Sequence, residues 1–317
     1  MNIKYTIPYQ FTKSVEKYWN KPMLAHVSEK PTSYKEAEVL IKSLCSFLTD
    51  IGIKKSSKVA ILGENSVNWG VTYLAITSMG AVVVPILPGF SDVEIENVLQ
   101  HSETECLFVS DKQFKKINSE NLNSLHSIID INDFAILKGS RESNFKYGKY
   151  CTDRFEVSED DLAAIIYTSG TTGKSKGVML SHKKICYNVE SSGILQPVFP
   201  SDRFLSILPL SHTYENTLGF LLPIFNGASI YYLKQITAPS VIIKALQEVK
   251  PTMMLTVPMI IENIYRHRIA PSFRKNKIIT RLYSNKRLKL FLHRIAGKKL
   301  LKTFGGKIRF FGVGGAK

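Results

Sequence analysis

Hydroxyl, glycine and lysine residues crowd one short segment of this chain, from Tyr167 to Gly177. Its glycines can adopt backbone angles that other residues avoid, which lets backbone N–H groups turn toward a ligand. The hydroxyl groups and lysines add donors and positive charge, so several phosphate oxygens can be bound at once. The segment therefore predicts a site for a nucleotide polyphosphate, with binding groups at Thr168, Ser169, Gly170, Thr171, Thr172, Gly173, Lys174 and Lys176.

The triplet Gly173-Lys174-Ser175 also invites comparison with the commoner phosphate loop, whose pattern is G-x-x-x-x-G-K-[ST] followed by a helix. That pattern requires a glycine where Thr168 stands, and here a strand-like run, Val178 to Leu180, follows instead. Spacing and context both exclude the commoner loop. A loop of this composition that binds no ligand is the alternative.

Short apolar runs alternate with amphipathic helices along most of the chain. Capping boxes at Ser33 with Glu36 and at Ser91 with Glu94 predict two helix starts. The alternation predicts an α/β fold with mainly parallel sheets flanked by helices. The predicted strands are 58–62, 81–86, 106–109, 163–167, 204–208, 228–233, 252–256 and 308–313. The predicted helices run from the cap at Ser33 to Gly52 and over 67–79, 91–102, 181–194, 239–249 and 258–267.

Two stretches lack these patterns. The chain before Ser33 is expected to be an extended arm. Residues 134–160 are polar and of mixed charge, so we expect an internal connection that leads to the phosphate loop.

His212 stands in the sequence L-P-L-S-H-T-Y-E, directly after the predicted strand at 204–208. A lone histidine is more often structural or simply exposed than functional. Because α/β sheets place ligand contacts beyond the carboxyl ends of their strands, this position makes His212 a candidate ligand contact.

Three of these segments resemble signatures of the AMP-forming adenylating enzymes, a superfamily that includes the acyl-CoA synthetases. They are Y-T-S-G-T-T-G-K-S-K-G-V-M-L-S-H from Tyr167, P-L-S-H-x-x-E around His212, which is similar to long-chain acyl-CoA synthetases, and G-G-A near the end. Ser175 departs from the family, which usually has proline there; proline stiffens the loop but adds no donor. The resemblance implies His212 as the catalytic residue at the acyl and α-phosphate region, with Glu215 beside it. It also implies Thr168 as the Mg²⁺ contact and Gly314, Gly315 and Ala316 as a nucleotide-facing turn.

The function implied by the resemblance is that of a long-chain fatty acid CoA ligase. A fatty carboxylate attacks the α-phosphate of ATP, pyrophosphate leaves, and the CoA thiol then displaces AMP, so ATP, Mg²⁺ and CoA are the implied cofactors and cosubstrates. The resemblance covers about the first half of a family enzyme. Residues 1–317 are therefore expected to be a partial N-terminal AMP-binding domain, with its phosphate loop at 167–177, without the small C-terminal domain and inactive alone. The alternative is a non-catalytic nucleotide-binding or membrane-associated module.

Composition limits the class of protein. With 317 residues and 44% hydrophobic content, the chain can bury a large core and is not disordered. Its four cysteines are far apart, which fits reduced thiols better than a disulfide framework or a metal site. The N-terminus lacks the apolar centre of a signal peptide, and no apolar run is long enough to span a bilayer. We therefore expect a cytoplasmic protein that touches a membrane at most from outside.

The net charge of +16 is concentrated at one end of the chain. Residues 263–317 hold 16 lysines and arginines and no acidic residue, whereas residues 1–262 carry 26 basic and 26 acidic side chains. The segment 266–309 could therefore contact an anionic membrane, although a basic helix is as often only solvated surface. No pattern of a nucleic-acid-binding module accompanies the charge, so no nucleic acid is expected.

Overall fold

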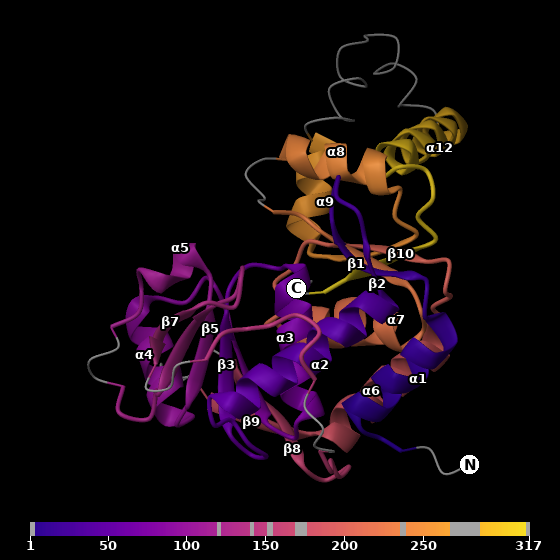
Figure 1. The fold of residues 1–317 in the computed structure, drawn as a ribbon. Helices are drawn as coiled ribbons and strands as arrows, with labels where there is room; N and C mark the ends of the chain where they lie inside the picture. Colours follow the sequence, from indigo (N-terminus) through magenta and orange to yellow (C-terminus); the bar gives the residue numbers. More distant parts are fainter. Residues whose placement is uncertain are drawn as a thin grey trace.

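The structure, a computed structural model, describes residues 4–118, 122–139, 143–150, 155–168, 176–234, 239–266 and 286–314. These residues form two β-sheets with helices between and outside them (Figure 1). The prediction of an α/β fold with mainly parallel sheets flanked by helices is confirmed.

The first sheet has seven strands in the order β7-β6-β5-β3-β4-β8-β9. Its central strands pair in parallel, and the two edge strands β7 and β9 pair antiparallel with their neighbours. In that order, the strands are Ile136–Gly139, Ser127–Asp130, Cys106–Val109, Lys58–Leu62, Val82–Ile86, Leu162–Thr168 and Lys176–Ser181.

The second sheet has six strands in the order β13-β12-β10-β11-β1-β2. All its pairs are parallel apart from β1 with β2, and β13 lies at the other edge. In that order, the strands are Phe310–Val313, Met253–Thr256, Arg203–Ser206, Ser229–Tyr232, Pro22–His26 and Thr32–Ser33.

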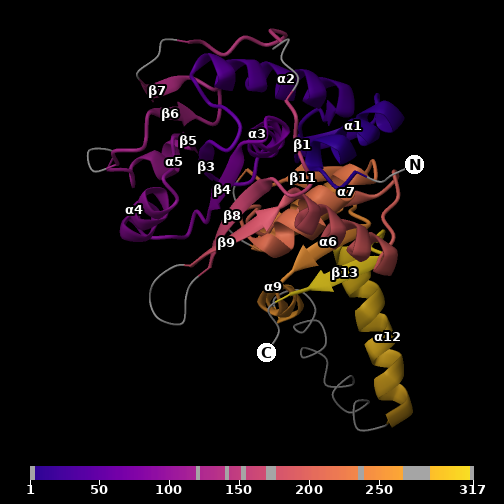
Figure 2. The same cartoon turned by 90° about the horizontal axis from the view of Figure 1, so that it is seen from below.

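The helices form three layers around these sheets (Figures 1 and 2). Between the sheets pack α1 (Ile7–Tyr18), α2 (Tyr34–Asp50), α3 (Val67–Ser78), α6 (His182–Leu195), the π-helix η2 (Glu215–Leu221) and α7 (Leu222–Phe225). On the outer side of the seven-stranded sheet lies α4 (Asp92–His101), whereas α5 (Asp111–Phe114) lies at one end of this sheet, above β5 in Figure 1. On the outer side of the six-stranded sheet lie α8 (Pro239–Val249), α9 (Pro258–Ile264) and α12 (Lys286–Thr303).

The alternation of side chains along β3 shows that the seven-stranded sheet contributes residues to two hydrophobic cores, one on each of its faces. Val59 and Ile61 point into the core between the sheets, whereas Ala60 and Leu62 point into the core under α4. All four are buried, because successive residues of a strand face opposite sides and this sheet is covered on both. The helix α3 lies inside the central core, where Trp69 is fully buried and stacks on Tyr73.

Most predicted elements are present within one to three residues of their expected ends. Both capping boxes are formed, at Ser33 with Glu36 and at Ser91 with Glu94. The strand predicted over 204–208 ends earlier, at Ser206, because the chain then turns away from its sheet neighbours. The predicted helix over 258–267 is α-helical only to Ile264.

Two predictions were wrong. The chain before Ser33 is not an extended arm: Thr6 caps α1, and the buried strand β1 follows in the six-stranded sheet. The stretch 134–160 is not purely a connection, since it contains the edge strand β7, which pairs with β6. The strands β1 and β7 have only five and four residues, and β1 pairs with β11 far along the chain, so local patterns gave little sign of them.

Among the described residues, no helix has the length and apolar character that crossing a bilayer requires. Three of the four cysteines, Cys45, Cys106 and Cys186, lie in the described part of the chain, and all three are buried.

Candidate functional site

The end of the β8–β9 hairpin next to the connecting loop carries Thr168 and Lys176, the two described residues among the predicted phosphate contacts. Thr168 ends β8, Lys176 begins β9, and the two are register partners. Both side chains are exposed, so a ligand can reach them. The remaining predicted contacts Ser169, Gly170, Thr171, Thr172, Gly173 and Lys174 lie outside the described residues.

The base of this hairpin is tightly packed. Gly177 lies so close to β8 that an added Cβ would come within 2.9 Å of Ile165 Cγ2 and 3.2 Å of Tyr167 Cζ. The Tyr167 hydroxyl is 2.7 Å from Nδ1 of His101 at the end of α4. This contact holds the strand that leads to the loop, and it was not predicted because His101 has no local signal of function.

A cavity of about 240 Å³ lies beside the hairpin and reaches the turn that follows β10. Side chains of the hairpin and of α6 form one wall, and the segment after β10 forms the other. Among the described residues that line it, Lys184 is the one that carries a charge. The cavity can therefore hold an apolar group next to an anionic one, between Ile166, Thr168, Val178, Leu180, Lys184, Ile185, Asn188, Thr213 and Thr217.

His212 lies next to this cavity in sequence, since its neighbour Thr213 is part of the lining. Its side chain is exposed, and its Nδ1 accepts a hydrogen bond from the Tyr214 backbone N–H at 3.2 Å. The His212 N–H in turn donates to the Pro209 carbonyl at 2.9 Å. The neutral ring thus carries its proton on Nε2, which leaves a donor for a ligand.

Glu215 is buried below His212, at the first residue of η2. The Ser206 hydroxyl donates to the Oε1 of Glu215 at 2.6 Å, whereas the Oε2 has no hydrogen-bond partner in the described part of the chain. Burial raises the pKa of Glu215 to about 8, against the lowering effect of the Ser206 hydrogen bond. At neutral pH this carboxyl is therefore mainly protonated, and its hydrogen bond with Ser206 connects the end of the turn to β10.

Gly314 ends the described part of the predicted nucleotide-facing turn. Its N–H donates to the Thr256 carbonyl at 3.0 Å, and an added Cβ would meet the Tyr214 ring at 3.0 Å. The small residue thus lets the His212 segment approach the end of β13. Gly315 and Ala316 lie outside the described residues, so the role of this turn stays a prediction.

Within the described ranges, no group of three or more histidine, cysteine, aspartate or glutamate residues could hold a metal ion. The predicted Mg²⁺ contact Thr168 is a single exposed hydroxyl. Such a group fits a metal that is held mainly by phosphates and water.

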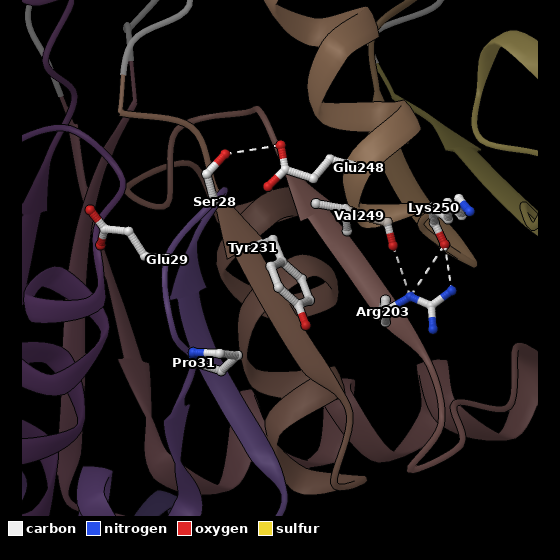
Figure 3. A pocket seen from close by; sticks show the side chains of 8 residues that line it. All are labelled: Ser28, Glu29, Pro31, Arg203, Tyr231, Glu248, Val249 and Lys250. Carbon is white, nitrogen blue, oxygen red and sulfur yellow. Dashed lines mark hydrogen bonds between the residues drawn. The ribbon is translucent and has the colours of Figure 1, made fainter.

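A second pocket, of about 570 Å³, lies beside the end of α8 (Figure 3). Its polar groups largely bind one another: Arg203 donates to the carbonyls of Val249 and Lys250, and Ser28 donates to Glu248 at 2.9 Å. None of the predicted site residues that the structure describes line it. It is therefore separate from the candidate site.

Comparison with known proteins places this geometry in a family. Two proteins of Arabidopsis thaliana are each 28% identical to this chain. The match to long chain acyl-CoA synthetase 4 covers 80% of this chain and 42% of that protein. The match to a chloroplastic long-chain-fatty-acid–[acyl-carrier-protein] ligase covers 82% of this chain and 39% of that protein. The chain spans about two fifths of the length of these relatives.

The solved structure of a Mycobacterium tuberculosis fatty acyl CoA synthetase superposes with a TM-score of 0.73 at 19% identity. The superposition covers 84% of this chain and 52% of the synthetase, and it shows that the two share a fold. Residues 11–317 match the family described as AMP-binding enzyme. Since that match extends over nearly the whole sequence, the chain belongs to the AMP-binding enzyme family.

Proposed function

We propose that the protein containing this chain is an AMP-forming ligase that activates long-chain fatty acids with ATP and passes the acyl group to CoA. The observation that carries the proposal is the shared cavity. Thr168 at the end of the predicted phosphate loop and Thr213 beside His212 line the same space. A phosphate group and a carboxyl group can therefore meet there. The names of the similar proteins support a long-chain acyl substrate.

Three of the described site residues, Thr168, Lys176 and His212, each have a physical role in this proposal. Lys176 and Thr168 bind phosphate oxygens at the hairpin end, where added positive charge stabilises the leaving pyrophosphate. The His212 Nε2–H donates to oxygen at the α-phosphate or acyl carboxylate. When it is bound, Mg²⁺ would neutralise part of the negative charge of the phosphates, and Thr168 would be its contact on the protein.

The apolar wall of the cavity would hold the part of the acyl group nearest the carboxylate. With 240 Å³, the cavity is smaller than the range of about 300–1,000 Å³ that is usual for sites of drug-sized ligands. We therefore propose that it holds the reacting groups and not a whole long-chain acyl adenylate.

The proposal is tested by the binding of a non-hydrolysable palmitoyl adenylate, palmitoyl sulfamoyl adenosine, to the 317-residue chain in a calorimeter. We expect ATP and palmitate each to compete with it, and the acetyl homologue to bind more weakly. A non-catalytic nucleotide-binding module is the other reading. It would bind ATP but gain nothing from the acyl group, and that result would contradict the proposal.

Because the chain spans about two fifths of its relatives, we further propose that these 317 residues alone do not complete acyl transfer. Hydroxylamine trapping of acyl adenylate from palmitate and ATP, and thioester assays with CoA, are expected to give background signals. Robust product from the purified chain would refute this point. Replacing CoA with acyl carrier protein in a complete enzyme tests the acceptor.

For the basic segment 266–309, we propose peripheral contact of a cytoplasmic protein with anionic membranes. On α12, the partly apolar surface at Ile295 and Leu301 lies among exposed Arg294, Lys298 and Lys302. Each basic residue near an anionic surface contributes about 1 kcal/mol. Co-sedimentation with anionic vesicles should fall with salt and with an R294E/K298E/K302E variant. Equal recovery with neutral vesicles would contradict the proposal.

A further inference from the structure

Asn65 connects the seven-stranded sheet to the segment that carries His212. It lies in the loop between β3 and α3, yet its side chain binds three groups that follow or end β10 in the other sheet. Nδ2 donates to the Ser206 hydroxyl at 3.0 Å and to the Leu208 carbonyl at 2.7 Å. Oδ1 accepts from the Leu210 N–H at 2.9 Å. Both amide hydrogens and one acceptor of Asn65 are thus used.

The Leu208 carbonyl and the Leu210 N–H lie beyond the end of β10, so they have no partners in the sheet. The strand ends at Ser206, and the following chain includes Pro209, which has no N–H to donate. The amide of Asn65 bonds a carbonyl and an N–H two residues apart, as a neighbouring strand would. It therefore extends the order of the sheet into the turn.

The contact continues to the candidate site through Ser206. The Ser206 hydroxyl accepts from Asn65 and donates to Glu215. Beyond Leu210, Asn216 Nδ2 donates to the Leu210 carbonyl at 3.2 Å, and the Asn216 N–H donates to the His212 carbonyl at 2.9 Å. Both ends of the turn that bears His212 are therefore held by one hydrogen-bond network, which is partly buried at Asn65 and buried at Glu215 and Asn216.

We propose that Asn65 is a positioning residue, which holds the turn from Leu208 to Glu215 so that His212 faces the phosphate-binding hairpin. The proposal rests on the proposed function for the role of His212, but not for the contacts of Asn65. Asn65 touches no predicted ligand position, so it acts through the turn. Loss of its amide leaves the Leu208 carbonyl and the Leu210 N–H without partners.

The test compares Asn65→Ala with Asn68→Ala. Asn68 is a matched control, because its Nδ2 also donates two hydrogen bonds, both to backbone carbonyls, those of Ile131 and Asn132, without contact to the turn. In the ligand-free chain, amide hydrogen exchange at Leu210 and Asn216 should become at least about tenfold faster in Asn65→Ala and stay unchanged in Asn68→Ala. The nitrogen signals of the His212 ring should shift in Asn65→Ala alone, since its Nδ1 acceptor geometry depends on the turn.

Ligand binding gives the second readout. Asn65→Ala should weaken palmitoyl sulfamoyl adenosine about tenfold or more and leave inorganic pyrophosphate unchanged, because the hairpin binds pyrophosphate without the turn. Equal weakening of both ligands, or equal effects of the two variants, would overturn the positioning role. If wild-type chain does not bind the adenylate analogue, the proposed function fails while exchange and ring signals still decide the positioning role. If Asn65→Ala does not fold, Asn65→Asp serves instead, since it keeps an acceptor for Leu210 and lacks the donors.

Discussion

The end of the β8–β9 hairpin and the turn after β10 border one cavity, but their side chains are held in different ways. At the hairpin end, Thr168 and Lys176 are exposed on strands whose base is packed. In the turn and directly beside it, Ser206, Ser211, Glu215 and Asn216 are all at most 3% exposed. Burial fixes the turn, and exposure leaves the hairpin end free to contact a ligand. Substitutions at the hairpin end should therefore change binding, whereas changes in the turn should also alter stability.

The largest effect is expected from removal of charge at the hairpin end. In Lys176→Ala, pyrophosphate binding should weaken by about 1.5–3 kcal/mol, because a charge-assisted contact is lost. Lys183→Ala is the control, since Lys183 pairs with Glu159 away from the cavity. Calorimetry with pyrophosphate measures both affinities. Equal affinity of the wild type and Lys176→Ala would exclude Lys176 from the site.

The buried turn should make stability depend on pH. The pKa of Glu215 is raised by burial to about 8 from 4.5, so its contribution is fully present below pH 4.5 and is lost as pH rises through 8. The fully buried His182 acts in the opposite direction: burial lowers its pKa from 6.5 to about 4. Its contribution is therefore complete above pH 6.5 and is lost toward pH 4.

When the pH rises from 6.5 to 8, ionisation of Glu215 lowers the free energy of unfolding by about 2 kcal/mol, whereas His182 does not lower it in this interval. Urea unfolding at the two pH values measures the decline, and Glu215→Gln should largely abolish it. A decline of the same size in Glu215→Gln would show that the turn does not contain the titrating group.

A smaller effect is expected at the base of the hairpin. His101→Ala removes the 2.7 Å contact to the Tyr167 hydroxyl and should cost about 1 kcal/mol of unfolding free energy. The exposed His126 provides a control, since its recorded hydrogen bond is made by the backbone N–H to the Glu105 carbonyl. Urea midpoints decide the comparison. Equal midpoints for His101→Ala and His126→Ala would mean that the base is held by packing alone.

The smallest effect on stability is expected for Thr168→Ala. Its side chain is exposed at the hairpin end, so the free energy of unfolding should change by less than about 0.5 kcal/mol. The same variant should bind Mg²⁺-ATP more weakly than the wild type. A loss of stability larger than 1 kcal/mol in urea would mean that the hairpin end is held as firmly as the turn.

Local signals predicted much of this molecule. The strands Lys58–Leu62 and Cys106–Val109 have the predicted bounds, because each is a compact apolar run between polar turns. The helix start at Tyr34 follows from the capping box of Ser33 and Glu36, whose bonds form between near neighbours. In contrast, α1 and β1 were missed, since β1 is a short strand that pairs with β11 far along the chain.

The candidate site shows the same division. Its residue types at Thr168, Lys176 and His212 were evident in the sequence, because a phosphate contact needs donors, charge and a strand end. The partners that support them were not. In the sequence, Asn65 looks like an ordinary loop residue and Glu215 is only a near neighbour of His212. In the structure, the Ser206 hydroxyl bonds to both side chains and so connects them.

By itself, the sequence determined the alternation of strands and helices, the donors and charges of the predicted phosphate loop and the position of the basic segment, because these depend on the order of residue types along the chain. Only the tertiary structure decided which sheet each strand joins and that the hairpin and the turn share a cavity. It also decided that Glu215 is buried, which raises its pKa. The physical reason is that burial and hydrogen bonding depend on distances in space, and residues such as Asn65 and Leu210 become neighbours only when the two sheets pack against a common core.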